Sequence, residues 1–359
     1  MEILRSLSNS FWTRHVWLPP NTTWADMEKN DIIQHTVPSD LIYPLPMALV
    51  LLVVRFIVEK YWFSPLGLVL GIKNSKPKRV PPNAVLESAY KKLKGPNKHK
   101  EILGLSKQVD LTERQIESWR CFYYTLAFFG GLYIVWDKPW LWDINKCWYS
   151  YPHQNLTNDV WWYYMFSMSF YWSLTMSQFF DVKRKDFWQM FVHHMATIML
   201  MAFSWMCNLT RIGTLVLVVH DCGDILLEAA KSAKYANYQR TCDLFFIFFT
   251  ALWLITRLGI YPFWIIYSTS IEAPTIVEMF PAYYIFNSLL LLLLVLHIFW
   301  TYLIMRIVYN SIVAGKMDGD VRSSTSDEIP SIPSEDEVLA NNHHKLSTPL
   351  HNANHTKKE

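Results

Sequence analysis

Long apolar stretches separated by short polar ones dominate the chain between residues 41 and 305. A helix needs about 20 apolar residues to cross the hydrocarbon of a bilayer. The windows that reach or approach this length are 41–58, 119–136, 160–180, 187–207, 212–230, 244–266 and 282–305. The second is short and the fifth contains Asp221, Asp224 and Glu228, so an amphipathic helix at the membrane interface is the alternative for these two. The pattern predicts an all-α multi-pass membrane protein with a bundle of about seven transmembrane helices, and six is the main competing number.

Lysine and arginine in short loops indicate the cytosolic side of a membrane protein. Segment 59–118 is rich in lysine and is assigned to the cytosol, together with the loops that hold Lys183–Lys185 and Lys231–Arg240. Residues 1–40 and the loops 137–158 and 268–281 then lie on the opposite, lumenal side. Residues 1–10 lack a basic start followed by an apolar core, so we expect window 41–58 to act as an uncleaved anchor.

The remaining segments complete the expected domain organisation. Residues 119–308 form the membrane domain, and residues 309–359, poor in aromatics and rich in Asp, Glu, Ser, Asn and His, form a disordered cytosolic tail. Asn21 starts an Asn-Thr-Thr sequon on the lumenal side and is the predicted glycosylation site. Asn155 is a weaker candidate, Asn208 lies too close to the membrane, and Asn354 lies in the cytosol.

Composition excludes several classes of protein. The chain is 52% hydrophobic, 16% aromatic and only 18% charged, which is not the balance of a soluble protein. Its mean hydropathy is nevertheless only +0.10, so the polar residues are concentrated in particular segments. Five cysteines without paired short spacings do not form a disulfide framework or a zinc ribbon. A net charge of +3 does not indicate a nucleic-acid partner for the whole chain.

Ionisable residues inside the predicted helices gather at one depth. His193 and His194 lie in the fourth window, and the fifth contains His220, Asp221, Asp224 and Glu228. At about 1.5 Å per residue, His194 is about 10 Å and Asp224 about 9 Å from the cytosolic ends of their windows. His297 of the last window reaches a similar depth. Ionisable groups at membrane depth are costly, so this layer is the candidate functional site.

A layer of histidines and carboxylates is suited to acyl transfer. Imidazole acts as a base or as a nucleophile, and a carboxylate orients it and accepts a proton from an incoming amine. The alternative is that these residues only hold the bundle together. A metal site is not expected, because oxygen-activating di-iron membrane enzymes need several separated histidine pairs and the predicted helices contain one. The cations near the cytosolic ends of these helices are Lys183, Arg184, Lys185, Lys231 and Lys234. They attract the phosphates of a cytosolic acyl thioester, or they only set the orientation of the chain in the membrane.

These residues belong to motifs that resemble the ceramide synthases. The matching stretches are Asp181-Val-Lys-Arg-Lys-Asp-Phe-Trp188, His193-His-Met-Ala-Thr197, Arg211-Ile-Gly213, His220-Asp-Cys-Gly-Asp224, Leu227-Glu-Ala-Ala-Lys231 and Thr256-Arg257. The resemblance is to the TRAM–Lag1–CLN8 (TLC) type of membrane domain over residues 119–305. It extends to the flanking segments, where the chain is most similar to an insect member of the family.

The resemblance implies an enzyme of the endoplasmic reticulum that transfers a fatty acyl group from acyl-CoA to the amine of sphinganine or sphingosine. It places the catalytic residues at His193, His194, Asp221 and Asp224, and by position we choose His194 as the acylated one. Substrate binding is assigned to Lys183, Arg184, Lys185, Lys231, His220, Glu228, Arg257 and His297. The loop before the last helix is expected to select the acyl chain, through Ser268, Thr269, Ser270, Ile271 and Glu272. Acyl-CoA is a co-substrate, no other cofactor is expected, and the resemblance implies a homodimer or a heterodimer in contact with membrane lipids.

Segment 59–118 departs from the family pattern. It begins like a homeodomain, with Pro77-Lys-Arg79 and the stretch 105–117, but residues 118–121 run directly into the second window. The helix that would enter a DNA major groove is missing, so no nucleic-acid partner is expected. The alternative function is a non-enzymatic member of the same fold class that serves in lipid sensing, lipid transport or translocation.

Overall fold

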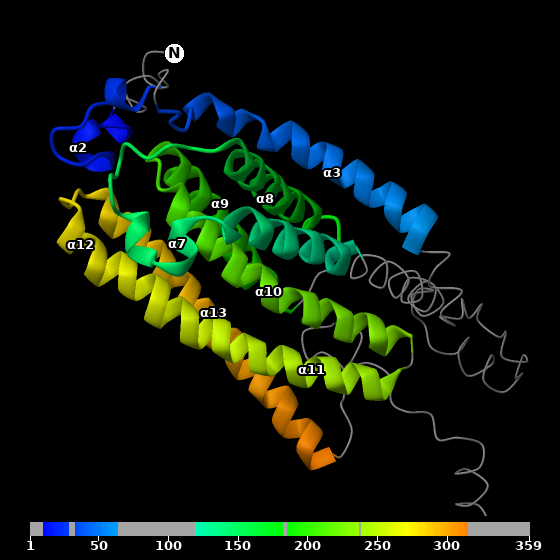
Figure 1. The fold of residues 1–359 in the computed structure, drawn as a ribbon. Helices are drawn as coiled ribbons and strands as arrows, with labels where there is room; N and C mark the ends of the chain where they lie inside the picture. The colour runs from blue at the N-terminus through cyan, green and yellow to red at the C-terminus, as the bar shows by residue number, and fades with distance from the viewer. Residues whose placement is uncertain (1–9, 29–32, 64–118, 182–184, 237, 315–359) are drawn as a thin grey trace, which may run out of the picture.

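The computed structural model describes residues 10–28, 33–63, 119–181, 185–236 and 238–314, and within these ranges it contains helices and no strand. Nearly all of the homeodomain-like segment (64–118) lies outside the described residues and stays a prediction. The predicted disordered tail is wrong over residues 309–314, which continue the last helix, and its remainder, 315–359, lies outside the described residues. Each of the predicted apolar windows is helical along most of its length. The long helices run roughly along one axis, and short helices and loops gather at the end that carries the N-terminus (Figure 1).

The bundle is made of long helices. They are α3 (Pro44–Val58), the helix of residues 119–136, α8 (Asn158–Ser177), α9 (Phe187–Met206), α10 (Thr210–Tyr235), α11 (Gln239–Trp253) and α13 (Ala282–Ala314). The short helices are α2 (Arg14–Trp17), η1 (Trp24–Met27), η2 (Pro38–Ile42), η3 (Glu59–Phe63), α7 (Pro139–Trp142) and η4 (Ile144–Cys147). At about 1.5 Å per residue, the 33 residues of α13 extend about 50 Å, well beyond a hydrocarbon core of about 30 Å.

The helix after α10 is longer than the sequence pattern predicts. α11 continues without a break into the π-helical turns of η5 (Leu254–Ile266) and η6 (Ser268–Glu272) and then into α12 (Ala273–Ile276). The predicted loop 268–281 is therefore wrong in its first half. Polar residues suggested a loop there, but the Ser268 hydroxyl accepts a hydrogen bond from Trp148, and the hydroxyls of Thr269 and Ser270 both donate to Asn287. Because each of these hydroxyls has a hydrogen-bond partner, the polar residues can form a helix inside the protein.

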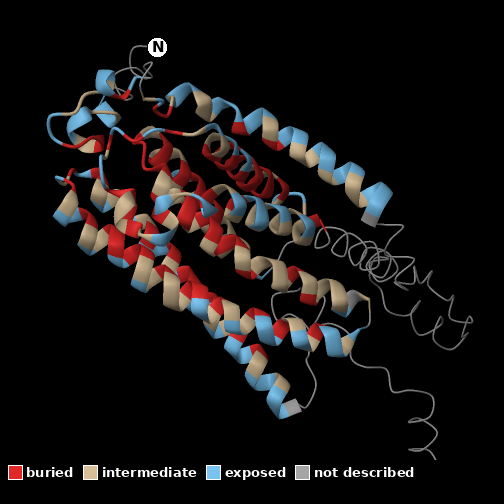
Figure 2. Cartoon of the chain, in the orientation of Figure 1, coloured by how far each residue is buried: buried red, intermediate tan, exposed pale blue. Residues whose placement is uncertain are grey.

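Burial separates the inner helices from the outer ones. α8, α9 and α10 are rich in buried residues, whereas α3 lies on the outside with most of its apolar residues exposed (Figure 2). In the described part of the chain, three helices are long and apolar enough to span a membrane: Pro38–Trp62, Gln239–Ile276 and Ala282–Val313. α8 and α10 are more polar because neighbouring helices shelter their serines, histidines and carboxylates from lipid.

The N-terminal segment is tied to the loops at one end of the bundle. Trp17 is fully buried and its carbonyl accepts a bond from the Cys207 thiol, while the indole of Trp205 donates to the Val37 carbonyl at 2.9 Å. The Gln34 backbone donates to Asn155 Oδ1 and accepts from the Leu156 backbone. These contacts hold the chain before α3 against the α7–α8 and α9–α10 connections.

Candidate active site

The two adjacent histidines lie two turns into α9, between α8 and α13. His194 is buried and His193 is half-buried. The His193 ring stands edge-on to Trp300 of α13, with centroids 5.3 Å apart. Both histidine rings also lie beside Tyr171 of α8, at centroid distances of 6.5 Å for His193 and 6.3 Å for His194. The layer predicted on α9 is thus enclosed by aromatic side chains from two other helices.

An amide orients His194. Nδ1 of His194 lies 3.1 Å from Oε1 of Gln178, the residue that caps the C-terminus of α8. The other end of the same amide, Nε2 of Gln178, donates to the carbonyl of Phe187 at 2.7 Å. The sequence analysis assigned this orienting role to carboxylates, and Gln178 was not among the predicted site residues.

The carboxylates of α10 face the same region and meet Arg257 of η5. Asp221 is buried and Asp224 is partly so. Arg257 is 2% exposed, and its Nη2 lies 3.5 Å from Asp224 Oδ2 and 2.5 Å from the His220 carbonyl oxygen. Tyr171, whose ring lies beside both α9 histidines, lines the same pocket as His220 of α10.

A second pair of histidines, His220 and His297, lies beside this layer and, with Tyr261 and Arg257, forms what we call the floor of the layer. The rings of His220 and His297 have centroids 5.0 Å apart, and each lies about as close to Tyr261, at 4.9 and 5.1 Å. His220 Nδ1 donates to the Val216 carbonyl at 2.7 Å. Four polar atoms are buried here without a hydrogen-bond partner in the described structure: His220 Nε2, His297 Nδ1, and Nε and Nη1 of Arg257. The floor therefore presents both donors and acceptors to a polar ligand.

The predicted phosphate-binding cations occupy different surroundings. Lys231 is nearly buried and its Nζ lies 3.2 Å from Glu228 Oε1, so it compensates that carboxylate. Lys185 is exposed at the start of α9. Lys183 and Arg184 lie outside the described residues and stay predictions. In the described part of the chain, no three His, Cys, Asp or Glu side chains gather as ligands for a metal ion.

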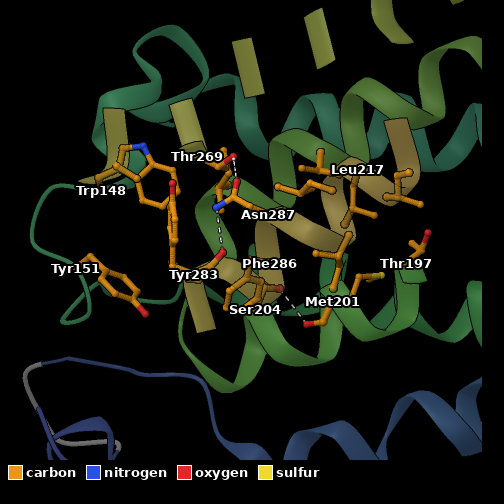
Figure 3. Close-up of a pocket in the computed structure, with 18 of the residues that line it drawn as sticks. Trp148, Tyr151, Thr197, Met201, Ser204, Leu217, Thr269, Tyr283, Phe286 and Asn287 are labelled. Carbon is orange, nitrogen blue, oxygen red and sulfur yellow. Dashed lines mark hydrogen bonds between the residues drawn. The ribbon is translucent and has the colours of Figure 1, made fainter. Parts of the chain in front are cut away.

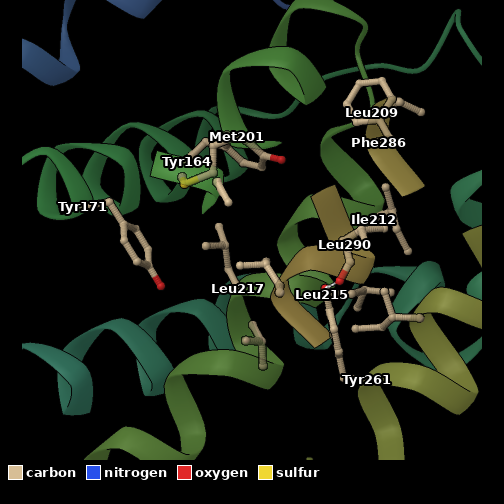
Figure 4. Close-up of a cluster of buried hydrophobic side chains, with 14 of the residues drawn as sticks. Tyr164, Tyr171, Met201, Leu209, Ile212, Leu215, Leu217, Tyr261, Phe286 and Leu290 are labelled. Atoms are coloured by element: carbon tan, nitrogen blue, oxygen red, sulfur yellow. Dashed lines mark hydrogen bonds between the residues drawn. The ribbon is translucent and has the colours of Figure 1, made fainter. Parts of the chain in front are cut away.

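A pocket leads away from the histidine layer. It encloses about 930 Å³ of empty space, its opening included, between α8, α9, α10, η6, α12 and α13 (Figure 3). At one end its lining includes Tyr171, Thr197 and His220, and Thr197 follows the histidines by one helical turn. At the other end lie Trp148, Tyr151 and Phe280. Between these ends the walls are almost wholly apolar, from residues such as Met201, Leu217 and Leu290 (Figure 4).

The residues assigned to acyl-chain selection lie at the far end of this pocket. Of them, only Thr269 lines it; Ser268 is buried against Trp148, and Ile271 is 55% exposed on the outer face of the helix. The lining continues instead through Ala273, Val277, Met279 and Phe280. The sequence analysis included these four residues only as part of the loop 268–281.

Comparisons with known proteins identify the family of the chain. Residues 114–306 match the TLC domain family. Human ceramide synthase 5 is 41% identical over 343 residues, which cover 88% of this chain and 87% of the relative. The chain belongs to the ceramide synthase family. Human ceramide synthase 3 is 40% identical, with 88% of each chain covered, and ceramide synthase hyl-1 of Caenorhabditis elegans is 34% identical, with 88% of this chain and 84% of the relative covered.

Several site residues of this ceramide synthase family member were missed by sequence reasoning. Gln178, Tyr171, Trp300 and Tyr261 all contact a histidine of the layer. The aromatics are hidden among many other aromatics in apolar helices, and no local pattern separates them. Gln178 carried a weak signal, as a lone amide between the apolar helix and Phe179-Phe180.

Proposed function

We propose that this protein is an acyl-CoA-dependent N-acyltransferase that joins a fatty acyl group to the amine of sphinganine or sphingosine and makes dihydroceramide or ceramide. Relatives that cover most of the chain are named ceramide synthases, which supports the reaction. One observation carries the assignment of the site: the apolar pocket ends at Tyr171, Thr197 and His220, beside the buried histidines and aspartates.

The pocket holds the acyl chain in this proposal. Its lining along α10 runs from Leu209 to His220, about 17 Å at 1.5 Å per residue. Apolar walls suit a hydrocarbon chain, which gains free energy by leaving water and needs no polar partner. With the chain seated in the pocket, its carboxyl end emerges at the histidine layer.

The first chemical step is attack by His194 on the thioester. The lone pair of its Nε2 forms a bond to the carbonyl carbon, the C–S bond breaks, and CoA leaves as a thiolate. The product is an acyl-imidazolium that retains the Nδ1 proton, and the Gln178 carbonyl oxygen that accepts this proton in a hydrogen bond stabilises the positive charge.

The second step transfers the acyl group to the amine. The amine nitrogen attacks the acyl carbon, the C–Nε2 bond breaks, and the lone pair returns to Nε2. The amine loses one proton to a carboxylate. The carboxylate then passes this proton on, and it finally neutralises the CoA thiolate. Asp224 pairs with Arg257, so we assign the proton transfer to Asp221. The role of Asp224 is to hold Arg257 in place within the layer.

The polar floor and the cations hold the rest of the substrates. A sphingoid base carries hydroxyl groups beside its amine, and hydroxyls satisfy both donors and acceptors, which fits the unpartnered atoms of His220, His297 and Arg257. In this proposal Lys183, Arg184, Lys185 and Lys231, with Glu228 3.2 Å from Lys231, attract the CoA phosphates on the cytosolic side. No cofactor or metal takes part in this scheme.

We also propose the placement in the membrane. The seven long helices span the bilayer of the endoplasmic reticulum, with residues 1–40 in the lumen and the C-terminus in the cytosol. This orientation puts the histidine layer in the cytosolic half, where acyl-CoA arrives, and the Trp148–Phe280 end of the pocket in the lumenal half. A homodimer or a heterodimer with another family member is the proposed assembly.

Acyl transfer by the purified full-length protein tests the proposed site. A labelled acyl group should pass from acyl-CoA to sphinganine with the wild type, and the His193→Ala and Asp221→Ala variants, at equal expression, should lose at least about a hundredfold in rate. Activity that survives both substitutions would remove the chemistry from this layer. A wild type that binds lipid but transfers no acyl group would favour a non-enzymatic member of the fold.

A further inference from the structure

The side chain of Gln178 joins the end of α8, the start of α9 and the His194 ring. It caps α8, its Nε2 lies 2.7 Å from the carbonyl oxygen of Phe187, the first residue of α9, and its Oε1 lies 3.1 Å from His194 Nδ1. It is partly buried, below the exposed Phe179 and Phe180.

The identity of these partners fixes the proton on His194. A backbone carbonyl only accepts hydrogen bonds, so the amide atom that faces Phe187 must be the NH₂ group. The atom that faces His194 is then the amide oxygen, which also only accepts. Nδ1 of His194 must therefore carry the hydrogen, and in a neutral imidazole the lone pair then lies on Nε2.

We propose that Gln178 is a positioning residue that fixes the tautomer of His194 and so makes Nε2 the nucleophilic atom. This inference rests on the proposed acyl transfer through His194. The carbonyl of Phe187 acts as an anchor, because it prevents the amide from turning its NH₂ group toward the ring. The same amide oxygen then accepts a hydrogen bond from the Nδ1–H group of the acyl-imidazolium during the reaction.

The first test replaces Gln178 in the full-length protein. In Gln178→Ala, Nδ1 loses the acceptor that Gln178 provides and the preference for the proton on Nδ1 weakens, so kcat should fall by roughly 10- to 100-fold while KM for acyl-CoA changes little. Gln239→Ala is the matched control, because it also removes a glutamine hydrogen bond of 2.7 Å, to Asp243, at the start of α11. The control should keep the wild-type kcat. If Gln178→Ala also kept the wild-type kcat, the proposed role would be excluded.

The second test separates tautomer control from support of the fold. His194 is replaced by Nδ-methylhistidine, whose lone pair is locked on Nε2, in the Gln178→Ala background, where the removed amide leaves room for the methyl group. This protein should regain about tenfold or more of the lost kcat, whereas Nε-methylhistidine in the same background, with no lone pair on Nε2, should regain none. Failure of the Nδ-methyl form to regain activity would show that Gln178 serves the fold and not the tautomer. His194→Ala, measured beside them, tests the parent proposal separately, since full activity there contradicts the role of His194 itself.

Discussion

Arg257 lies where the Gln239–Ile276 helix meets the polar groups of α10. Its guanidinium contacts Asp224 and the His220 carbonyl of α10, and it covers the Trp253 ring at 5.1 Å. Because the residue is 2% exposed, its charge depends on a partner that is also sheltered from water. The pair therefore stabilises the bundle only while both charges are present.

Replacing Arg257 by Leu leaves Asp224 without this partner. We expect the free energy of unfolding to fall by about 3–5 kcal/mol, since the change removes one charge of a sheltered ion pair and the bond to the His220 carbonyl. Thermal unfolding in detergent measures this change. Arg240→Leu, at an exposed position of α11, is the control and should leave the melting temperature close to that of the wild type. Equal melting of both variants would contradict the role given to Arg257.

The chemistry-bearing side chains could be found in the sequence because charges and imidazoles are rare inside apolar helices. His193, His194, His220, Asp221, Asp224 and His297 were all identified this way. Their partners could not be, since contacts such as Gln178–His194 join residues 16 positions apart through the packing of two helices. An amide near a helix end has no distinctive pattern until the neighbouring helix is placed.

The helix from Gln239 to Ile276 forms one wall of the pocket with its last turns. Its buried face there carries Thr269 and Ala273, and its outer face carries Ile271. The sequence pattern predicted the helix itself but ended it at residue 266. Hydroxyl-rich turns resemble loops in sequence, and their hydrogen bonds to Trp148 and Asn287 become visible only when α13 and the α7–α8 connection are in place.

Chain-length preference should follow the pocket lining and not the whole predicted segment. Ala273→Leu fills space at the pocket wall and should shift the products toward shorter acyl chains, while Phe280→Ala opens the far end and should shift them toward longer ones. Competition among acyl-CoAs of several lengths, with the ceramides measured by mass spectrometry, reads this out. Ile271→Ala, on the exposed face, should leave the distribution unchanged. A shift from Ile271→Ala alone would favour the sequence assignment over the pocket.

The close approach of α8 and α10 depends on Gly213. A Cβ atom at this position would lie 1.7 Å from the Tyr164 hydroxyl oxygen, which is buried and hydrogen-bonded to Ser204 at 2.7 Å. Gly213→Ala should therefore destabilise the protein by about 1–3 kcal/mol. Gly223 is the matched control on the same helix, where a Cβ atom meets nothing within 4 Å. Gly223→Ala should be neutral or slightly stabilising, so equal losses for both variants would contradict the packing argument.

The molecule joins an outer helix to an inner bundle through a small ionic network. Arg55 of α3 lies 2.7 Å from Glu59 and 3.1 Å from Asp181 beyond the end of α8, and Arg120 lies 3.9 Å from Asp181. Apart from this network, α3 presents mainly apolar side chains to its surroundings. The sequence predicted both helices and their apolar character, but no sequence pattern joins Arg55 to a residue 126 positions away.

The orientation in the membrane can be read from glycosylation. Asn21 is exposed, whereas Asn155 Oδ1 accepts a bond from the Gln34 backbone and Asn208 is fully buried, donating to the carbonyls of Pro152 and Gln154. We expect enzymatic removal of N-glycans to increase gel mobility in the wild type and in Asn155→Gln, and to have no effect on Asn21→Gln. A glycan that persists in Asn21→Gln would contradict this surface assignment.

The central claim is that the acyl group passes through His194 at the inner end of the pocket. The most direct measurement is peptide mass spectrometry after brief incubation of the full-length protein with acyl-CoA and no amine. The peptide that contains His194 should gain the mass of the acyl group, and the adduct should disappear on addition of sphinganine and be absent from His194→Ala. An enzyme that turns over normally but never carries the acyl group on this peptide would contradict the claim and favour direct transfer from the thioester to the amine.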